Sequence, residues 1–221
     1  MDIEANIREV QRRIGRACER RRRLPDEITL VAITKGVEVQ AIRAAFNLGI
    51  RNFGENRVQE AEEKIAQISA LRPAVAWHMV GHLQSNKAKI AMEIFDIIHS
   101  VDSVRLAEIL NRRAVEPFPV LLEVNVSGEA TKSGFSLSEV GAAVKEIGQL
   151  PNLKLMGLMT VAPLVADPEQ VRPVFSKLRE LRDSLGLEHL SMGMTDDFEV
   201  AVEEGATMLR IGRAIFGERR L

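Results

Sequence analysis

The sequence predicts an α/β protein, a single (β/α)8 barrel of the TIM type with one extra helix at its N-terminus. Eight short runs of apolar and β-branched residues alternate with segments of helical periodicity along the 221 residues. This alternation is typical of parallel strands joined by helical crossovers. Because no glycine- or serine-rich linker interrupts the series, eight such units favour a closed barrel. An open doubly wound sheet stays compatible, since periodicity does not reveal closure.

The extra helix is expected at residues 2–23, where Ile3, Ile7, Val10 and Ile14 recur at helical spacing. The strands are expected at residues 28–35, 50–56, 75–81, 94–101, 120–126, 153–160, 187–192 and 206–212. Helices are expected between them at residues 39–48, 57–71, 86–93, 103–114, 136–150, 168–185 and 197–204, with none after the last strand. The prediction is one domain over residues 1–221, with its helix at 1–23 and its barrel at 28–217.

Composition excludes several classes of protein. A net charge of −1 gives no general attraction to nucleic acid or to an anionic membrane, and we interpret Arg20–Arg23 as a solvated helix end rather than a phosphate patch. The lone Cys18 forms no internal disulfide, which suits a reducing compartment. The charged N-terminus resembles neither a signal peptide nor a membrane span, and no histidine or cysteine cluster has zinc spacing. We therefore expect a cytoplasmic protein without a metal.

The first strand ends on a lysine. Residues 28–34 have the composition of a strand buried on both faces, and Lys35 and Gly36 follow directly. A charged amine at the end of a buried strand is costly unless a site uses it. A lysine whose pKa is lowered by such surroundings is a good nucleophile toward an aldehyde, so Lys35 is a candidate for a Schiff base. Taken alone, the strand favours the simpler interpretation that Lys35 extends into solvent.

In a (β/α)8 barrel the functional face is formed by the carboxyl ends of the strands. The ends of the predicted strands are unusually polar for apolar segments, which favours a ligand site. The polar residues at or just after the strand ends, in chain order, are Lys35, Asn56, His78, His82, Asp102, Asn125, Thr160, Ser191, Thr195, Arg210 and Arg213.

The segments after strands seven and eight have the features of a phosphate site. Residues 191–197 place small and hydroxylated side chains before a helix, and the loops after these two strands commonly hold phosphate in such barrels. Gly193 and Gly212 let the backbone approach a bound group closely. The alternative is that Thr195 and Asp196 only cap the helix. The two glycine-containing loops together lead us to prefer phosphate.

A reactive lysine after strand one and a phosphate site after strands seven and eight require a ligand with both an aldehyde and a phosphate. Pyridoxal 5′-phosphate (PLP) has both groups. Arg210 would stand near its ring, and a guanidinium there would keep the pyridine nitrogen unprotonated and weaken the ring as an electron sink. A structural ion pair is an equally good interpretation of Arg210 on spacing alone.

Several sequence blocks are similar to those of a known family. They are, in order, Ala32–Lys35, Phe53–Asn56, Trp77–Lys87, Lys132–Phe135, Gly157–Thr160, Leu190–Met194 and Leu209–Gly217. Over nearly the whole chain this set resembles the PLP homeostasis proteins of the YggS/PROSC type, whose barrel resembles the N-terminal domain of alanine racemase. Members of that family are described as non-enzymatic PLP binders that affect vitamin B6 and amino-acid balance.

The resemblance implies a role for each matching residue. Lys35 would carry PLP as a covalent imine, Asn56 would lie beside the cofactor, and Arg210 would face the pyridine nitrogen. The phosphate would be held by Ser191, Gly193, Thr195 and the backbone around Gly212 and Arg213. We also assign His78 to the cofactor site. Two positions depart from the family pattern, because Thr195 replaces the usual serine and Arg213 the usual threonine. Threonine keeps the hydroxyl, and position 213 would contribute only its backbone N–H.

Two enzymatic alternatives to a PLP carrier require residues that this chain lacks. A racemase of the alanine racemase type needs a tyrosine as second base and a further β-domain, whereas this chain has no tyrosine and ends at residue 221. A phosphosugar enzyme with a Schiff-base lysine needs that lysine in mid-barrel, and none ends strand five or six. We therefore expect a monomeric PLP homeostasis protein without robust catalysis, although slow racemase-like side activity is compatible. PLP-dependent apo-enzymes are its expected recipients.

Overall fold

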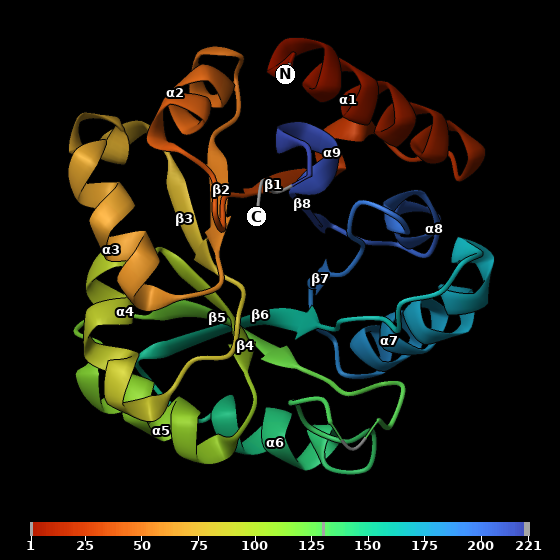
Figure 1. Cartoon of the computed structure of the whole chain (residues 1–221). Helices are drawn as coiled ribbons and strands as arrows, with labels where there is room; N and C mark the ends of the chain where they lie inside the picture. The colour runs from red at the N-terminus through yellow and green to blue at the C-terminus, as the bar shows by residue number, and fades with distance from the viewer. Residues whose placement is uncertain (1, 130, 219–221) are drawn as a thin grey trace.

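The computed structural model describes residues 2–129 and 131–218. Eight parallel strands follow one another around a closed barrel, and the last is hydrogen-bonded to the first. Helices form an outer ring, and the N-terminal helix lies outside it, next to the C-terminal elements (Figure 1). The predicted barrel and its extra helix are confirmed. The two ends of the predicted domain, residue 1 and residues 219–221, lie outside the described residues.

The elements alternate in the predicted order. The strands are β1 Thr29–Ile33, β2 Asn52–Glu55, β3 Ala76–Met79, β4 Ile97–Val101, β5 Phe118–Glu123, β6 Leu153–Met159, β7 His189–Ser191 and β8 Met208–Ile211. The α-helices are α1 Ile3–Arg20, α2 Val39–Asn47, α3 Val58–Gln67, α4 Ala88–Ile94, α5 Val104–Arg113, α6 Val140–Ile147, α7 Arg172–Ser184, α8 Phe198–Glu203 and α9 Arg213–Phe216.

The described residues include an α-helix that the sequence did not predict. We expected no helix after the eighth strand, but α9 follows β8 directly. Its four residues are too few to show a helical repeat in the sequence, and its contacts with α1 contribute to its packing. Its buried residues are Ile215 and Phe216.

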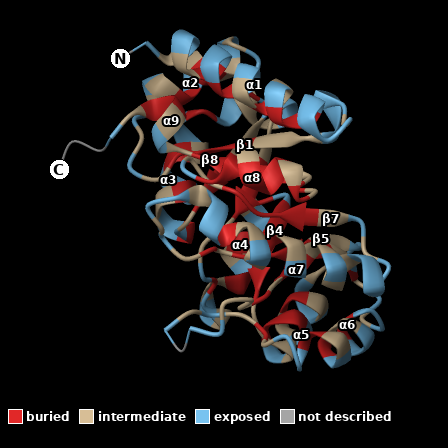
Figure 2. Cartoon of the chain, turned by 90° about the vertical axis from the view of Figure 1, so that its right-hand side faces the viewer, coloured by how far each residue is buried: buried red, intermediate tan, exposed pale blue. Residues whose placement is uncertain are grey.

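The apolar residues form two separate clusters. The larger one fills the layer between the strands and the surrounding helices, and most strand residues are buried (Figure 2). The smaller one comprises Ile97, Leu121, Met159 and Met208, with Met156 and Val161 packed against it. These strand residues alternate with residues of the larger cluster, as expected for side chains that point into the barrel. The apolar filling of the barrel is therefore small, and polar side chains take the remaining space.

The arginine run after α1 joins the helix to the barrel. Arg20 Nε lies 2.5 Å from Glu203 Oε1, and Arg23 Nη1 donates to the Val202 carbonyl at 2.8 Å. Arg21 contacts the buried Glu204, which also forms ion pairs with two arginines of α7. The run ends a helix, as predicted, but three of its residues contact the end of α8 rather than only solvent.

Replacing Glu204 by alanine is expected to lower the free energy of unfolding by about 2 kcal/mol. The reason is that Arg172 and Arg179, each 2.8 Å from its carboxylate, lose a buried partner. These arginines are about one third exposed, so water compensates part of the loss. Urea denaturation would measure the effect. Glu180→Ala, which removes an exposed partner of Lys177, is the matched control and should change stability by under ~0.5 kcal/mol.

No helix within the described ranges is both long enough and apolar enough to cross a membrane.

Candidate functional site

The first strand and the last meet at the barrel mouth. Lys35 is half-buried, two residues beyond Ile33 at the end of β1. Gly212 follows β8 directly and packs against the end of β1. A Cβ added to Gly212 would lie 3.2 Å from the Ile33 carbonyl oxygen. The lysine and the loop after β8 are therefore neighbours, as the predicted site requires.

The loops after β7 and β8 are joined to each other. The backbone N–H of Ala214 donates to Thr195 Oγ1 at 3.3 Å, and the Arg213 guanidinium forms an ion pair with Asp196. Gly193 has φ +93°, and a Cβ there would lie 2.5 Å from the Ala201 Cβ. No other residue would fit that position without moving α8. The loops that we predicted to bind phosphate thus form one connected surface.

The alternative role of Thr195 and Asp196 as helix caps is wrong. The N-cap residue of α8 is Asp197, whose Oδ1 accepts from the backbone N–H of Met194 at 2.6 Å. Thr195 and Asp196 instead contact the chain after β8. Their role toward a phosphate remains a prediction.

A chain of hydrogen bonds crosses the barrel interior. Asn52 Oδ1 lies 3.0 Å from His78 Nε2, and His78 Nδ1 lies 2.9 Å from His99 Nε2. His99 Nδ1 lies 2.8 Å from Ser191 Oγ, which accepts from Arg210 Nη1 at 2.6 Å. We call these five residues the interior relay. They come from β2, β3, β4, β7 and β8, and all except Asn52 are buried.

Arg210 is held by neutral acceptors. Its Nη1 donates to Ser191 Oγ and its Nη2 to the Thr160 carbonyl at 2.8 Å. In the described parts of the chain no carboxylate lies within 4.0 Å of the guanidinium, so the ion-pair interpretation of Arg210 is wrong. Burial lowers the pKa of Arg210 to about 10, and the charges of Asp197 and Glu123 oppose that shift. Arg210 is therefore a buried cation at neutral pH.

The relay determines where two predicted site residues lie. His78 is only 3% exposed, and both of its ring nitrogens have partners inside the barrel. Ser191 is fully buried, and its hydroxyl contacts His99 and Arg210. Their side chains thus support Arg210 from within the barrel, while Thr195, Gly212 and Arg213 come together at the mouth. Direct cofactor contacts by His78 and Ser191 remain predictions.

A second buried cluster lies beside the lysine turn. Lys64 Nζ donates to the Thr34 carbonyl at 2.5 Å, to Glu55 Oε1 at 2.8 Å and to Glu60 Oε1 at 2.6 Å. Glu60 also accepts from the backbone N–H of Gly36 at 2.5 Å. Hydrogen bonds therefore hold the residues on both sides of Lys35. Asn56, the predicted neighbour of the cofactor, follows Glu55 at the end of β2.

Sequence reasoning missed the importance of Lys64 and His99. Lys64 is buried, although charged residues surround it in the sequence of the 57–71 helix. Its position three residues after Ala61 and six after Val58, both buried, could have revealed it. His99 lies in an apolar strand, two residues after Ile97. Residues two apart in a strand share a face, so His99 points into the barrel as Ile97 does.

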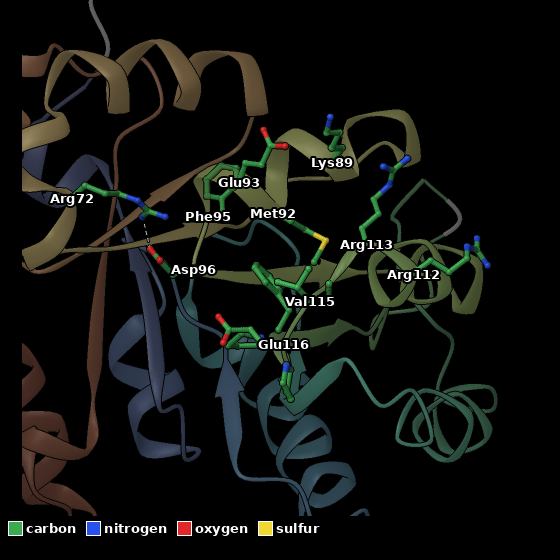
Figure 3. A pocket seen from close by; sticks show the side chains of 14 residues that line it. Arg72, Lys89, Met92, Glu93, Phe95, Asp96, Arg112, Arg113, Val115 and Glu116 are labelled. Atoms are coloured by element: carbon green, nitrogen blue, oxygen red, sulfur yellow. Dashed lines mark hydrogen bonds and ion pairs between the residues drawn. The ribbon is translucent and has the colours of Figure 1, made fainter.

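Two cavities lie away from this site. One of about 620 Å³ is lined by residues of α4 and α5 and by residues that precede β4 and β5, including Phe95, Arg112 and Val115 (Figure 3). A second of about 560 Å³ adjoins it and shares Arg112 and Arg113. Because most residues that line the first cavity precede β4 and β5 or lie on α4 and α5, that cavity lies toward the amino-terminal end and outer side of the barrel. The second cavity is also lined by Ser85 and Asn86, which follow β3. None of the predicted site residues lines either cavity.

Fold and site together define a class of protein, the barrels of the alanine racemase N-terminal type. The family model "Alanine racemase, N-terminal domain" matches residues 2–220. The chain is 44% identical to the "Pyridoxal phosphate homeostasis protein" of Aquifex aeolicus (strain VF5), with 100% of both chains covered. It is 42% identical to the protein of the same name from Pseudomonas aeruginosa, with 98% of this chain and 96% of the other covered.

A solved structure is also similar over nearly its whole length. PipY of Synechococcus elongatus PCC7942 with PLP bound has a TM-score of 0.82 at 38% identity, and the match covers 93% of this chain and 100% of PipY. The chain belongs to the pyridoxal phosphate homeostasis protein family.

Proposed function

We propose that this protein binds PLP as a Schiff base on Lys35 and acts in PLP and amino-acid homeostasis without robust catalysis. The observation that carries the proposal is the contact of Gly212 with Ile33, which brings the loop after β8 next to the lysine turn. A ligand with an aldehyde at one end and a phosphate at the other suits that arrangement. The PLP bound to the related PipY supports the same ligand.

The residues at the mouth fit the groups of PLP. The Lys35 amine would attack the aldehyde carbon and form a C=N bond with loss of one water molecule. Thr195 and the backbone of Gly193, Gly212 and Arg213 would hold the phosphate, because backbone N–H groups of glycine loops bind anions well. When bound, PLP supplies an electron-withdrawing ring to an amino group attached at its aldehyde carbon.

The surroundings of that ring favour a carrier over an enzyme. Arg210 is a buried cation that carries no proton-accepting group, so it would leave the pyridine nitrogen unprotonated and the ring a weak electron sink. The relay histidine His78 has partners at both ring nitrogens, which makes it a poor general base.

Asn56 would lie beside the cofactor. We further propose a cytoplasmic monomer that passes PLP to apo-enzymes.

Labelling of the purified protein tests the Lys35 assignment. After incubation with PLP and reduction with borohydride, proteolytic mapping should locate the pyridoxyl group on a peptide that contains Lys35. Arg113→Ala, a change in the cavity of Figure 3 at the other end of the barrel, is the control and should be labelled like the wild type. Label on another lysine of the wild type, or none on folded protein, would contradict the proposal.

Exchange of the α-proton of alanine and serine with solvent separates a carrier from a racemase. We expect exchange well below ~1 per second for the PLP-loaded protein, since typical enzymes turn over at that rate or faster. Faster exchange would instead support the racemase alternative.

A further inference from the structure

We propose that His99 and His78 are positioning residues, which orient the Ser191 hydroxyl and through it hold the Arg210 guanidinium in one place. The proposal deepens the proposed function and rests on it, because Arg210 matters there as the group that faces the PLP ring. This role requires no direct contact between either histidine and the cofactor. Their effect on the site passes through Ser191.

The direction of every hydrogen bond in the interior relay follows from its arginine end. A guanidinium only donates, so Ser191 Oγ must accept from Arg210 Nη1 at 2.6 Å. The Ser191 hydroxyl proton then points to the other close partner, His99 Nδ1 at 2.8 Å. His99 Nδ1 is therefore an acceptor, and the proton of the neutral ring resides on Nε2.

The position of the proton on the His78 ring follows from its position on the His99 ring. His99 Nε2–H donates to His78 Nδ1 at 2.9 Å, which leaves the His78 proton on Nε2. That N–H donates to Asn52 Oδ1 at 3.0 Å. A second proton on either ring would place two donors against each other at one of these contacts. Burial favours the neutral rings as well, because it lowers the pKa of both histidines.

This order of donors gives Arg210 a fixed acceptor. Its guanidinium is held at two points, Ser191 Oγ on β7 and the Thr160 carbonyl at the end of β6. The carbonyl belongs to the backbone and cannot turn, whereas a serine hydroxyl rotates unless its proton has an acceptor. His99 supplies that acceptor, and His78 with Asn52 keeps His99 in the required tautomer.

Nitrogen NMR of the protein without PLP tests the relay directly. In ¹⁵N-histidine-labelled wild-type protein at neutral pH, both buried rings should give the pattern of the neutral Nε2–H tautomer. In Ser191→Ala, the Nδ1 signal of His99 should shift, because it loses its hydrogen-bond donor. A charged ring, or an Nδ1–H tautomer at either histidine, would overturn the proposal. This measurement requires neither PLP binding nor a variant of the histidines.

The affinity and absorbance of bound PLP measure the effect of the interior relay on the site. His99→Leu and Ser191→Ala should each weaken PLP binding about tenfold and shift its absorbance. His99→Leu leaves the Ser191 hydroxyl proton without its acceptor, and Ser191→Ala removes an acceptor of the Arg210 guanidinium. The double variant should be no weaker than either single one, because both changes interrupt the same path. His99→Asn, which can still accept from Ser191, should recover part of the affinity. His189→Gln, two residues before Ser191 on β7, is the control.

The outcomes separate this proposal from the proposed function. Folded His99→Leu protein with the affinity and absorbance of the wild type would overturn the positioning role and leave PLP binding intact. Wild-type protein that takes up no PLP would overturn the proposed function, while the tautomers measured by NMR would still decide for or against the relay.

Discussion

Replacing Lys64 by methionine is expected to lower the free energy of unfolding by about 3–5 kcal/mol, the usual loss when one partner of a buried ion pair is removed. The Lys64 ammonium is the shared partner of Glu55, Glu60 and the Thr34 carbonyl. Glu55 is fully buried, and its Oε2 already has no hydrogen-bond partner. Without the lysine, the Glu55 carboxylate would keep only its contact with the Thr34 hydroxyl, at 2.7 Å.

The pKa shifts of Glu55 and Glu60 support the expected loss of stability. Burial raises the pKa of Glu55, and the hydrogen bond from Lys64 opposes the rise. For Glu60, burial acts the same way but is outweighed by hydrogen bonds from Lys64 and the Gly36 N–H, so its pKa is lowered. Loss of Lys64 therefore destabilises two carboxylates at once. It also removes the hydrogen bond to the Thr34 carbonyl, next to Lys35.

Urea denaturation of Lys64→Met and of a matched surface variant measures the effect. Lys177→Met also removes a helical lysine paired with a glutamate, but Lys177 is 57% exposed and 3.6 Å from Glu180, so it should change stability by under ~0.5 kcal/mol. Adding Glu55→Gln to Lys64→Met should restore part of the loss, because the buried charge is removed as well. A loss below ~1 kcal/mol for Lys64→Met would show that the cluster is not the buried ion pair described above.

Acid is expected to destabilise the protein through His78 by about 2 kcal/mol between about pH 7.5 and about pH 5. Burial lowers the pKa of His78 from 6.5 to about 3. Below pH 6.5 the unfolded chain therefore binds a proton at this residue, and the folded protein does not until about pH 3. Because the unfolded state binds more protons in this window, stability falls as the pH falls. Burial also lowers the pKa of His99, which acts in the same direction.

The difference between wild type and His78→Gln isolates this effect from the other titrating groups. Glu123 and Asp197, whose pKa values are raised by burial, act in the opposite direction but are present in both proteins. Denaturation curves at the two pH values should therefore show a smaller acid loss in His78→Gln. The Lys177→Met protein should keep the acid loss of the wild type. Equal acid losses in wild type and His78→Gln would indicate that His78 is already charged in the folded protein.

Much of the fold was determined by local sequence. Apolar runs of strand length alternate with helical repeats, and this pattern specifies parallel strands and their order. The chemistry of the strand ends followed from the same pattern, because all carboxyl ends of a parallel barrel meet at one face. Lys35, Gly193 and Gly212 could be located in this way from their positions in the chain. The short α9 could not, because four residues carry no periodic signal.

Only the tertiary structure decided which polar groups pair inside the barrel. Barrel closure brings β8 next to β1. The pairing of β6, β7 and β8 places Arg210 near Ser191 and Thr160, which are 19 and 50 residues away in sequence. His99 and Ser191 are separated by 92 residues, and Lys64 and Thr34 by 30. Periodicity indicates which face a side chain occupies, but the register between strands determines its partner across the interior. The lysine at the mouth was therefore visible in the sequence, whereas the groups that hold its surroundings in place were not.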